Sequence, residues 1–115
     1  LPIGIIVNKY SASAAEIFAG AMQDNNRAII VGTSTYGKGL IQTVIPLTDG
    51  SAIKLTTAQY FRPSGSPITK SGIRPDIVIK NTESASKNDR DESIYEDLQL
   101  SEAINIMNNR LEYNH

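Results

Sequence analysis

The sequence contains no cysteine, and its only histidine is His115 at the C-terminal end. The absence of cysteine excludes disulfides, thiolate metal sites and thiol catalysis. One terminal histidine does not support a Ser-His-Asp triad or a histidine pair for a metal, and no carboxylates cluster with ligand spacing. We therefore expect no metal and no cofactor, and a serine paired with a lysine is the hydrolytic mechanism that remains.

An excess of charge of one sign and a long apolar run are also missing. The 115 residues carry 11 basic and 12 acidic side chains and a formal net charge of -1, so no basic face is predicted for nucleic acid or anionic lipid. The longest apolar run, residues 3–7, is far shorter than the ~20 residues of a membrane helix. The chain begins with Leu1 and shows no signal-peptide pattern, so we expect it to be part of a longer protein.

The first third of the chain has the pattern of a strand–helix–strand unit. Apolar runs at 3–7 and 28–31 are typical of strands buried on both faces. The helix between them should end near residues 25–26, with parallel strands and a right-handed crossover, and function should collect at residues 8–13. Its predicted apolar stripe is Ala14, Ile17, Phe18, Ala21 and Met22, with Glu16, Gln23 and Asp24 away from it.

The remaining residues predict a hairpin and a second helix. Residues 40–47 and 52–61 favour strands, and the Asp49-Gly50 pair between them predicts an antiparallel hairpin. Residues 63–75 have loop composition, and 77–79 can add a short strand. We predict an α/β core over 1–80, a polar linker over 81–97 and a helix over 98–111. The expected stripe of that helix is Leu100, Ala103, Ile104, Met107 and Leu111.

Ser13 and Lys38 lie in two loops that should meet. Each loop follows a strand of the same unit, and neighbouring parallel strands are ~5 Å apart, so a hydroxyl and an amine can approach each other. A free lysine has a pKa near ~10.4 and acts as a base only if burial or positive potential lowers it. Gly37 and Gly39 would allow a turn that brings Lys38 into the interior. The Ala14 amide could donate to an oxyanion.

Each of these residues also has a simpler explanation. Ser13 and Glu16 have the spacing of a capping box, in which the serine only satisfies helix amides. Lys38 could be an exposed loop lysine, although the Ser or Thr that follows the lysine of a phosphate-binding Walker loop is missing. Gln42 would ordinarily be a polar residue on a strand face.

Several motifs in order resemble the carboxyl-terminal processing peptidases, a family of serine peptidases also called tail-specific proteases. The motifs are Ser11-Ala12-Ser13-Ala14-Ala15-Glu16, Thr35-Tyr36-Gly37-Lys38-Gly39 with Gln42, Tyr60-Phe61-Arg62-Pro63-Ser64-Gly65 and Gly72-Ile73-Arg74-Pro75-Asp76. The resemblance covers most of residues 3–80. It implies that Ser13, rather than Ser11, is the nucleophile, that Lys38 is its base, and that Gln42 positions the lysine amine.

The resemblance also implies a fold, substrates and a location. The fold would be the layered α/β arrangement of crotonase-like and Clp-type peptidases. Substrates would be proteins or peptides with apolar C-termini, with an adaptor or an oligomer as further partners, in the periplasm or cell envelope of a bacterium. Neither the PDZ domain of the family nor the upstream glycine that supplies a second oxyanion donor is visible in this sequence.

A non-catalytic peptide- or lipid-binding relative of the same fold and an incomplete, inactive fragment are the alternative functions. If residues 38–42 formed a regular strand, the Cα atoms of Lys38 and Gln42 would lie ~13 Å apart. We therefore expect this segment to be turned or helical.

Overall fold

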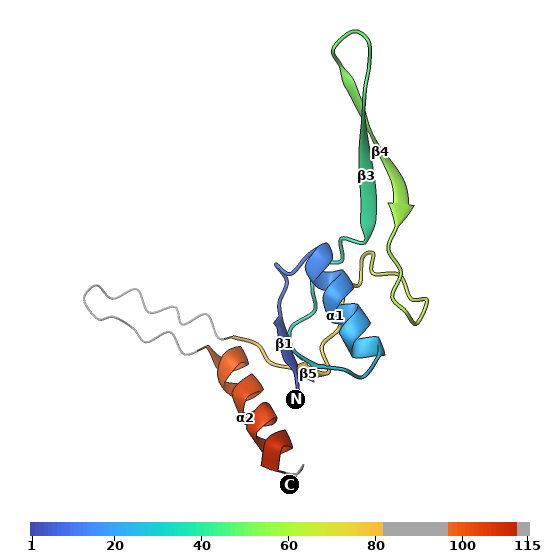
Figure 1. The fold of residues 1–115 in the computed structure, drawn as a ribbon. Helices are drawn as coiled ribbons and strands as arrows, with labels where there is room; N and C mark the ends of the chain where they lie inside the picture. The colour runs from blue at the N-terminus through green and yellow to red at the C-terminus, as the bar shows by residue number, and fades with distance from the viewer. Residues whose placement is uncertain (82–96, 113–115) are drawn as a thin grey trace, which may run out of the picture.

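The computed structural model of the protein describes residues 1–81 and 97–112 (Figure 1). The predicted linker at 81–97 lies outside the described residues except for its two ends. The elements are β1 (Gly4–Val7), α1 (Ala14–Asp24), β2 (Ile29–Gly32), β3 (Leu40–Pro46), β4 (Ala52–Gln59), β5 (Ile77–Val78) and α2 (Leu98–Glu112). The predicted order of strands and helices is confirmed.

Three strands form a parallel sheet in the order β1-β2-β5. Val7 pairs with Gly32 at the end of β1, and Gly32 pairs with Val78 of β5. Because α1 connects the parallel strands β1 and β2, this part of the chain is the predicted βαβ unit. The carboxyl ends of the strands therefore share one edge, where ligands and catalytic groups usually gather in α/β sheets.

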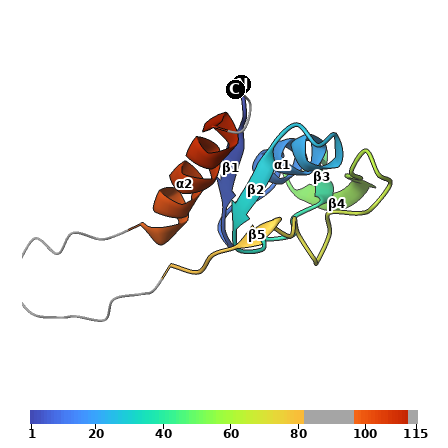
Figure 2. The same ribbon diagram turned by 90° about the horizontal axis from the view of Figure 1, so that it is seen from below.

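The two helices cover opposite faces of the sheet (Figure 2). Successive strand residues face opposite sides. Ile5 packs against the core beneath α1, whereas a Cβ on the preceding Gly4 would lie 3.4 Å from Met107 of α2. The core consists of residues from the sheet, from α1 and from the loop before β5, namely Val7, Ala19, Ile30, Ile68 and Ile73.

The predicted apolar stripe of α1 is correct only in part, because Ile17 packs against the core but Ala14 and Phe18 are exposed. The buried residues of the helix are Glu16, Ala19 and Gly20, whereas Phe18 is 57% exposed. Small side chains explain this choice of face, since a Cβ on Gly20 would lie only 2.9 Å from Ile73 Cδ1. The helix therefore makes its closest approach to the core at its small residues, while Phe18 stays outside.

The predicted stripe of α2 is correct only in part. Ala103 is buried and Met107 is half-buried, but the other three predicted members, Leu100, Ile104 and Leu111, are exposed. Gln99 is buried instead, and its side-chain amide donates to the Ile79 carbonyl at 2.9 Å. Neither described helix has the length and continuous apolar surface of a bilayer-spanning helix.

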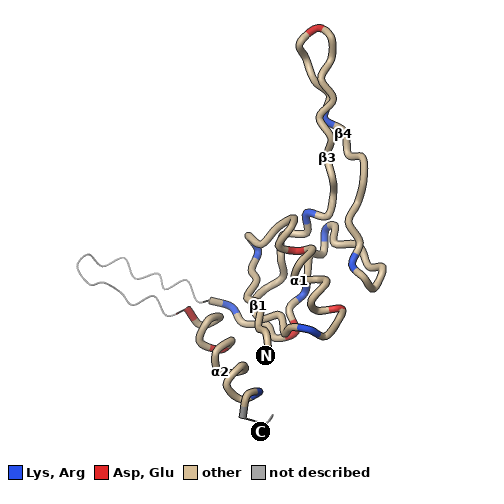
Figure 3. The backbone as a smooth tube through the Cα atoms, in the orientation of Figure 1, with Lys and Arg blue, Asp and Glu red and all other residues tan. Residues whose placement is uncertain are grey.

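The β3–β4 hairpin extends away from the rest of the fold (Figure 1). Its strands are antiparallel, as predicted, and pair from Leu40↔Gln59 to Pro46↔Ala52. All residues of both strands except half-buried Ile41 are exposed. Lys, Arg, Asp and Glu residues are distributed over the hairpin, the loops and the helices rather than gathered on one element (Figure 3).

An ion pair ties the loop after β4 to α1. The Arg62 guanidinium pairs with Asp24, and Asp24 Oδ2 accepts from the Ser64 N–H at 3.0 Å. Partial burial acts to raise the pKa of the Asp24 carboxyl, but the hydrogen bonds from Arg62 and Ser64 together outweigh it and lower this pKa from its usual 3.8. The carboxylate form of Asp24 therefore stabilises the fold.

We predict that Asp24→Asn lowers the free energy of unfolding at pH 7 by about 1–3 kcal/mol, because Arg62 and Ser64 lose a charged acceptor. The folded-state pKa is the lower one, so this stabilisation is complete above the unfolded-state pKa and is lost as the pH falls through the folded-state pKa. Denaturant unfolding of both proteins from pH 7 to 2 should show the difference disappearing.

Asp49→Asn is the matched control. The pKa of Asp49 is also lowered, by hydrogen bonds from Ser51, but both residues belong to the exposed hairpin turn. This variant should unfold much like the wild type. A stability difference for Asp24→Asn that persists unchanged at the lowest pH would contradict the proposed role of the carboxylate.

Candidate active site

The two loops that carry Ser13 and Lys38 meet at the carboxyl edge of the sheet, as expected. Residues 8–13 follow β1 and residues 33–39 follow β2, which is its parallel neighbour. The Tyr36 N–H donates to the Ser11 carbonyl at 2.9 Å and joins the loops directly. The sequence thus predicts correctly that both segments reach one site.

Ser13 has an unusual backbone conformation. It is the N-cap of α1, with φ 53° and ψ -117°. A positive φ at a residue with a Cβ is strained and often marks a functional site. A sharp turn between a strand and a helix also presents the nucleophile in the α/β-hydrolases. The strain is therefore a first structural argument for a chemical role of Ser13.

The capping box explains Glu16 better than it explains the Ser13 hydroxyl. Glu16 Oε2 accepts from the Ser13 N–H at 3.0 Å, which completes the glutamate half of the motif. The Ser13 side chain faces the N3 backbone N–H, as in a complete capping box, but within the described part of the chain it makes no cap hydrogen bond of strict geometry. Ser13 can therefore begin the helix while its hydroxyl stays available for chemistry.

Ser11 has a different role. Its hydroxyl accepts from the Asn8 N–H at 3.1 Å, and its own N–H donates to the Asn8 carbonyl at 2.9 Å. These bonds close the turn after β1. Because its hydroxyl oxygen already serves this turn, the geometry favours Ser13 over Ser11 as a nucleophile.

Glu16 is fully buried and connects the two loops. Its side-chain oxygens accept from the Ser13 N–H at 3.0 Å, the Thr35 hydroxyl at 2.5 Å, the Gly37 N–H at 2.5 Å and the Lys38 N–H at 2.9 Å. We call this arrangement the Glu16 clamp. The expectation that Glu16 lies away from the buried face is wrong, because these four donors compensate the cost of burying a carboxylate.

Thr35 extends the clamp to the loop before β5. Its hydroxyl donates to Glu16, and the same oxygen accepts from the Ile73 N–H at 2.7 Å. Sequence reasoning missed Glu16 and Thr35 as site residues. The capping-box spacing was a signal for Glu16, but it indicated only helix capping, and nothing near Thr35 indicated a buried partner.

Lys38 is held by its backbone, while its side chain is exposed. Gly37 has φ 86°, which provides the predicted turn, and a Cβ on Gly39 would lie 2.7 Å from the Thr69 nitrogen. The expected burial of Lys38 is not found. Among the residues that the structure describes, no hydrogen bond joins the side chains of Lys38 and Ser13, so the clamp aligns their backbones only.

Gln42 lies on the exposed surface of β3. The prediction of a turned or helical segment over 38–42 is wrong for residues 40–42, which belong to this strand. Strand pairing begins at Leu40, and the register shifts between Ile41 and Gln42. This irregularity changes the local direction of the strand next to the Gly-Lys-Gly turn.

The helix start provides one candidate oxyanion donor. Ala14 is the first residue of α1 and is exposed, and its N–H has no hydrogen-bond acceptor within residues 1–81 and 97–112. First-turn amides point out of a helix and carry its positive end. In the same described ranges, no group of three or more His, Asp or Glu side chains could hold a metal ion.

Residues 1–79 match peptidase family S41. The chain belongs to this family. The carboxy-terminal-processing protease of Bartonella bacilliformis is 54% identical over 79 residues, which cover 69% of this chain and 18% of the relative. Other relatives of this S41 chain are named as chloroplastic C-terminal processing peptidases.

Solved structures of proteases are also similar to this chain. The photosystem II D1 C-terminal processing protease is similar with a TM-score of 0.67 and 47% identity over 69% of the S41 chain and 20% of that protein. The tricorn protease is similar with a TM-score of 0.73 and 25% identity over 96% of this chain and 10% of its own. The chain thus spans about a fifth or less of each of these three proteins.

We predict that Glu16→Gln loosens both loops at once. An amide group in place of one carboxylate oxygen would face N–H donors that need an acceptor, which should cost about 1–3 kcal/mol of stability. Amide hydrogen exchange should accelerate at Ser13, Gly37 and Lys38 together. Glu102→Gln, on α2, is the control and should leave these amides unchanged. Faster exchange at one loop alone would contradict the clamp.

Proposed function

We propose that this chain carries the nucleophile and the general base of a serine endopeptidase that cleaves proteins near their C-termini. The observation that carries the proposal is the Glu16 clamp. It fixes the strained N-cap Ser13 and the Gly-Lys-Gly turn to one buried carboxylate. Membership of family S41 and relatives named as processing proteases support the same reaction.

In the proposed reaction, the Lys38 amine takes the proton of the Ser13 hydroxyl as Oγ attacks the scissile carbonyl. The Ala14 N–H donates to the oxyanion that develops on the carbonyl oxygen. The C–N bond then breaks, and Lys38 returns the proton to the leaving amine. Water hydrolyses the acyl-enzyme ester on Ser13 by the same route. Gln42 acts as a positioning residue for the lysine amine.

A non-catalytic binding protein of the same fold is the second candidate. Burial of Lys38 would have opposed it, but Lys38 is exposed in the described part of the chain, so that argument does not apply. The strained backbone of Ser13 opposes it instead, since a binding protein has no need of such strain.

The wider setting is also part of the proposal. Residues 1–80 would form the peptidase core, with 81–97 as a linker and 98–111 as a C-terminal helix, in a layered fold of the crotonase and Clp-peptidase kind. The two helical layers around the sheet support this fold. We propose substrates with apolar C-termini, an adaptor or an oligomer as further partners, and a bacterial periplasm or envelope as the location.

We predict that Ser13→Ala abolishes cleavage of a tailed protein substrate by the full-length protein, with kcat falling by about 10⁴-fold or more. Lys38→Ala should have a similar effect, whereas Ser11→Ala should keep most of the activity, because its hydroxyl serves only the turn at Asn8. Mass spectrometry after reaction with a fluorophosphonate should place the adduct on Ser13. Cleavage that survives in Ser13→Ala would overturn the proposal.

Gln42→Ala tests the positioning role. We predict that kcat falls by about 10-fold with little change in KM, because a misplaced base affects the chemical step rather than binding. Thr43→Ala is the neighbouring control, since Thr43 Oγ1 forms a hydrogen bond with Thr57 Oγ1 across the hairpin at 2.8 Å. Equal effects of the two substitutions would indicate a role in strand structure instead.

A further inference from the structure

A cavity of about 460 Å³ opens beside the proposed dyad. It is lined by Tyr10, Ala12, Tyr36 and Lys38, and we call it the tyrosine cavity. Ala12 directly precedes Ser13, and Lys38 is the proposed base. The cavity therefore lies where a substrate side chain would be when its peptide bond reaches the dyad.

Two exposed aromatic rings form the walls of this cavity. Tyr10 is 79% exposed and Tyr36 is 66% exposed. Their backbones are nevertheless fixed, because the Tyr10 N–H donates to Asn8 Oδ1 at 2.9 Å and the Tyr36 N–H donates to the Ser11 carbonyl at 2.9 Å. Large aromatic surfaces on anchored loops are typical of sites that bind apolar groups.

We propose that the tyrosine cavity is a specificity subsite that holds a bulky apolar side chain of the residue next to the scissile bond. This inference rests on the proposed peptidase function. An extended peptide rises ~3.3 Å per residue, so a residue adjacent to the attacked carbonyl can reach a cavity that is lined by Ala12, the residue before Ser13. The rings and the Lys38 stem offer that side chain apolar surface.

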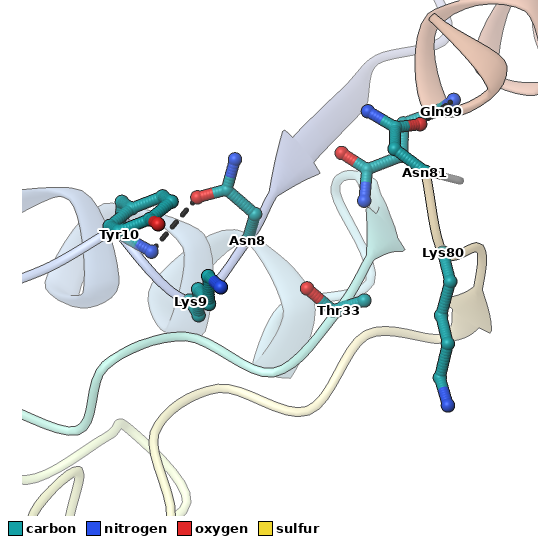
Figure 4. A pocket seen from close by; sticks show the side chains of 7 residues that line it. All are labelled: Asn8, Lys9, Tyr10, Thr33, Lys80, Asn81 and Gln99. Atoms are coloured by element: carbon teal, nitrogen blue, oxygen red, sulfur yellow. Dashed lines mark hydrogen bonds between the residues drawn. The ribbon is translucent and has the colours of Figure 1, made fainter. Parts of the chain in front are cut away.

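A cation near the cavity adds a second element of selectivity. Lys9 Nζ lies 5.1 Å from the centre of the Tyr10 ring, which lines the cavity. Tyr10 also lines a neighbouring polar cavity of about 300 Å³ that includes Lys9, Thr33 and Lys80 (Figure 4). A basic substrate side chain would meet like charge here, so it should be rejected.

The test uses the full-length protein and peptides that differ only in one residue next to the cleaved bond, placed on either side of it. We expect kcat/KM for Phe or Leu to exceed that for Ala by about 10–200-fold, with Lys the poorest substrate. Tyr36→Ala should reduce the Phe-to-Ala ratio to a few-fold, because the Phe side chain loses most of its apolar contact surface. Tyr36→Phe should keep the ratio, which excludes misfolding as the cause.

Two further variants separate the sources of selectivity. Phe61→Ala removes an aromatic ring that is 60% exposed but does not line the cavity, so the Phe-to-Ala ratio should be unchanged. Lys9→Glu should raise cleavage of the Lys peptide several-fold, and this gain should shrink at high salt. An unchanged Phe-to-Ala ratio in Tyr36→Ala overturns the subsite. Cleavage that persists in Ser13→Ala overturns the proposed function itself.

Discussion

The carboxylate of Glu16 is the constraint on which the arrangement of the candidate site depends. It is buried in the first turn of α1, and all four donors that bond it belong to the helix start or to residues 35–38. Burying a carboxylate costs several kcal/mol, which hydrogen bonds of about 1.5–3 kcal/mol each to a charged group can offset. The helix start and the Gly-Lys-Gly turn therefore cannot move independently of each other.

Local signals explain why the elements could be predicted from the sequence. Each of these signals specifies the backbone through its own residues. They are the apolar runs at 3–7 and 28–31, the Asp49-Gly50 pair and the loop composition of residues 63–75. The parallel pairing of β1 with β2 then follows from the helix between them. No distant contact had to be known for any of these predictions.

The faces of the helices could not be predicted in this way. Helical periodicity locates large apolar residues, whereas packing against a nearby sheet selects side chains that fit. Gly20 lies so close to Ile73 that α1 turns its small residues inward and leaves Phe18 exposed. Glu16 becomes an interior residue only because residues 35–38 bring donors from more than fifteen positions away, which no local pattern encodes.

The proposed dyad also depends both on local sequence signals and on contacts that only the structure reveals. Spacing alone could not separate Ser11 from Ser13, and the structure favours Ser13 through the bond that engages the Ser11 hydroxyl. The clamp aligns the backbones of Ser13 and Lys38, and a dyad requires such an alignment.

A lysine base also needs surroundings of low polarity or positive potential. In the described part of the chain the Lys38 side chain is exposed, and it lines the tyrosine cavity together with Tyr36. A bound apolar substrate side chain would exclude water at that position, so substrate selection and activation of the base would take place at one surface.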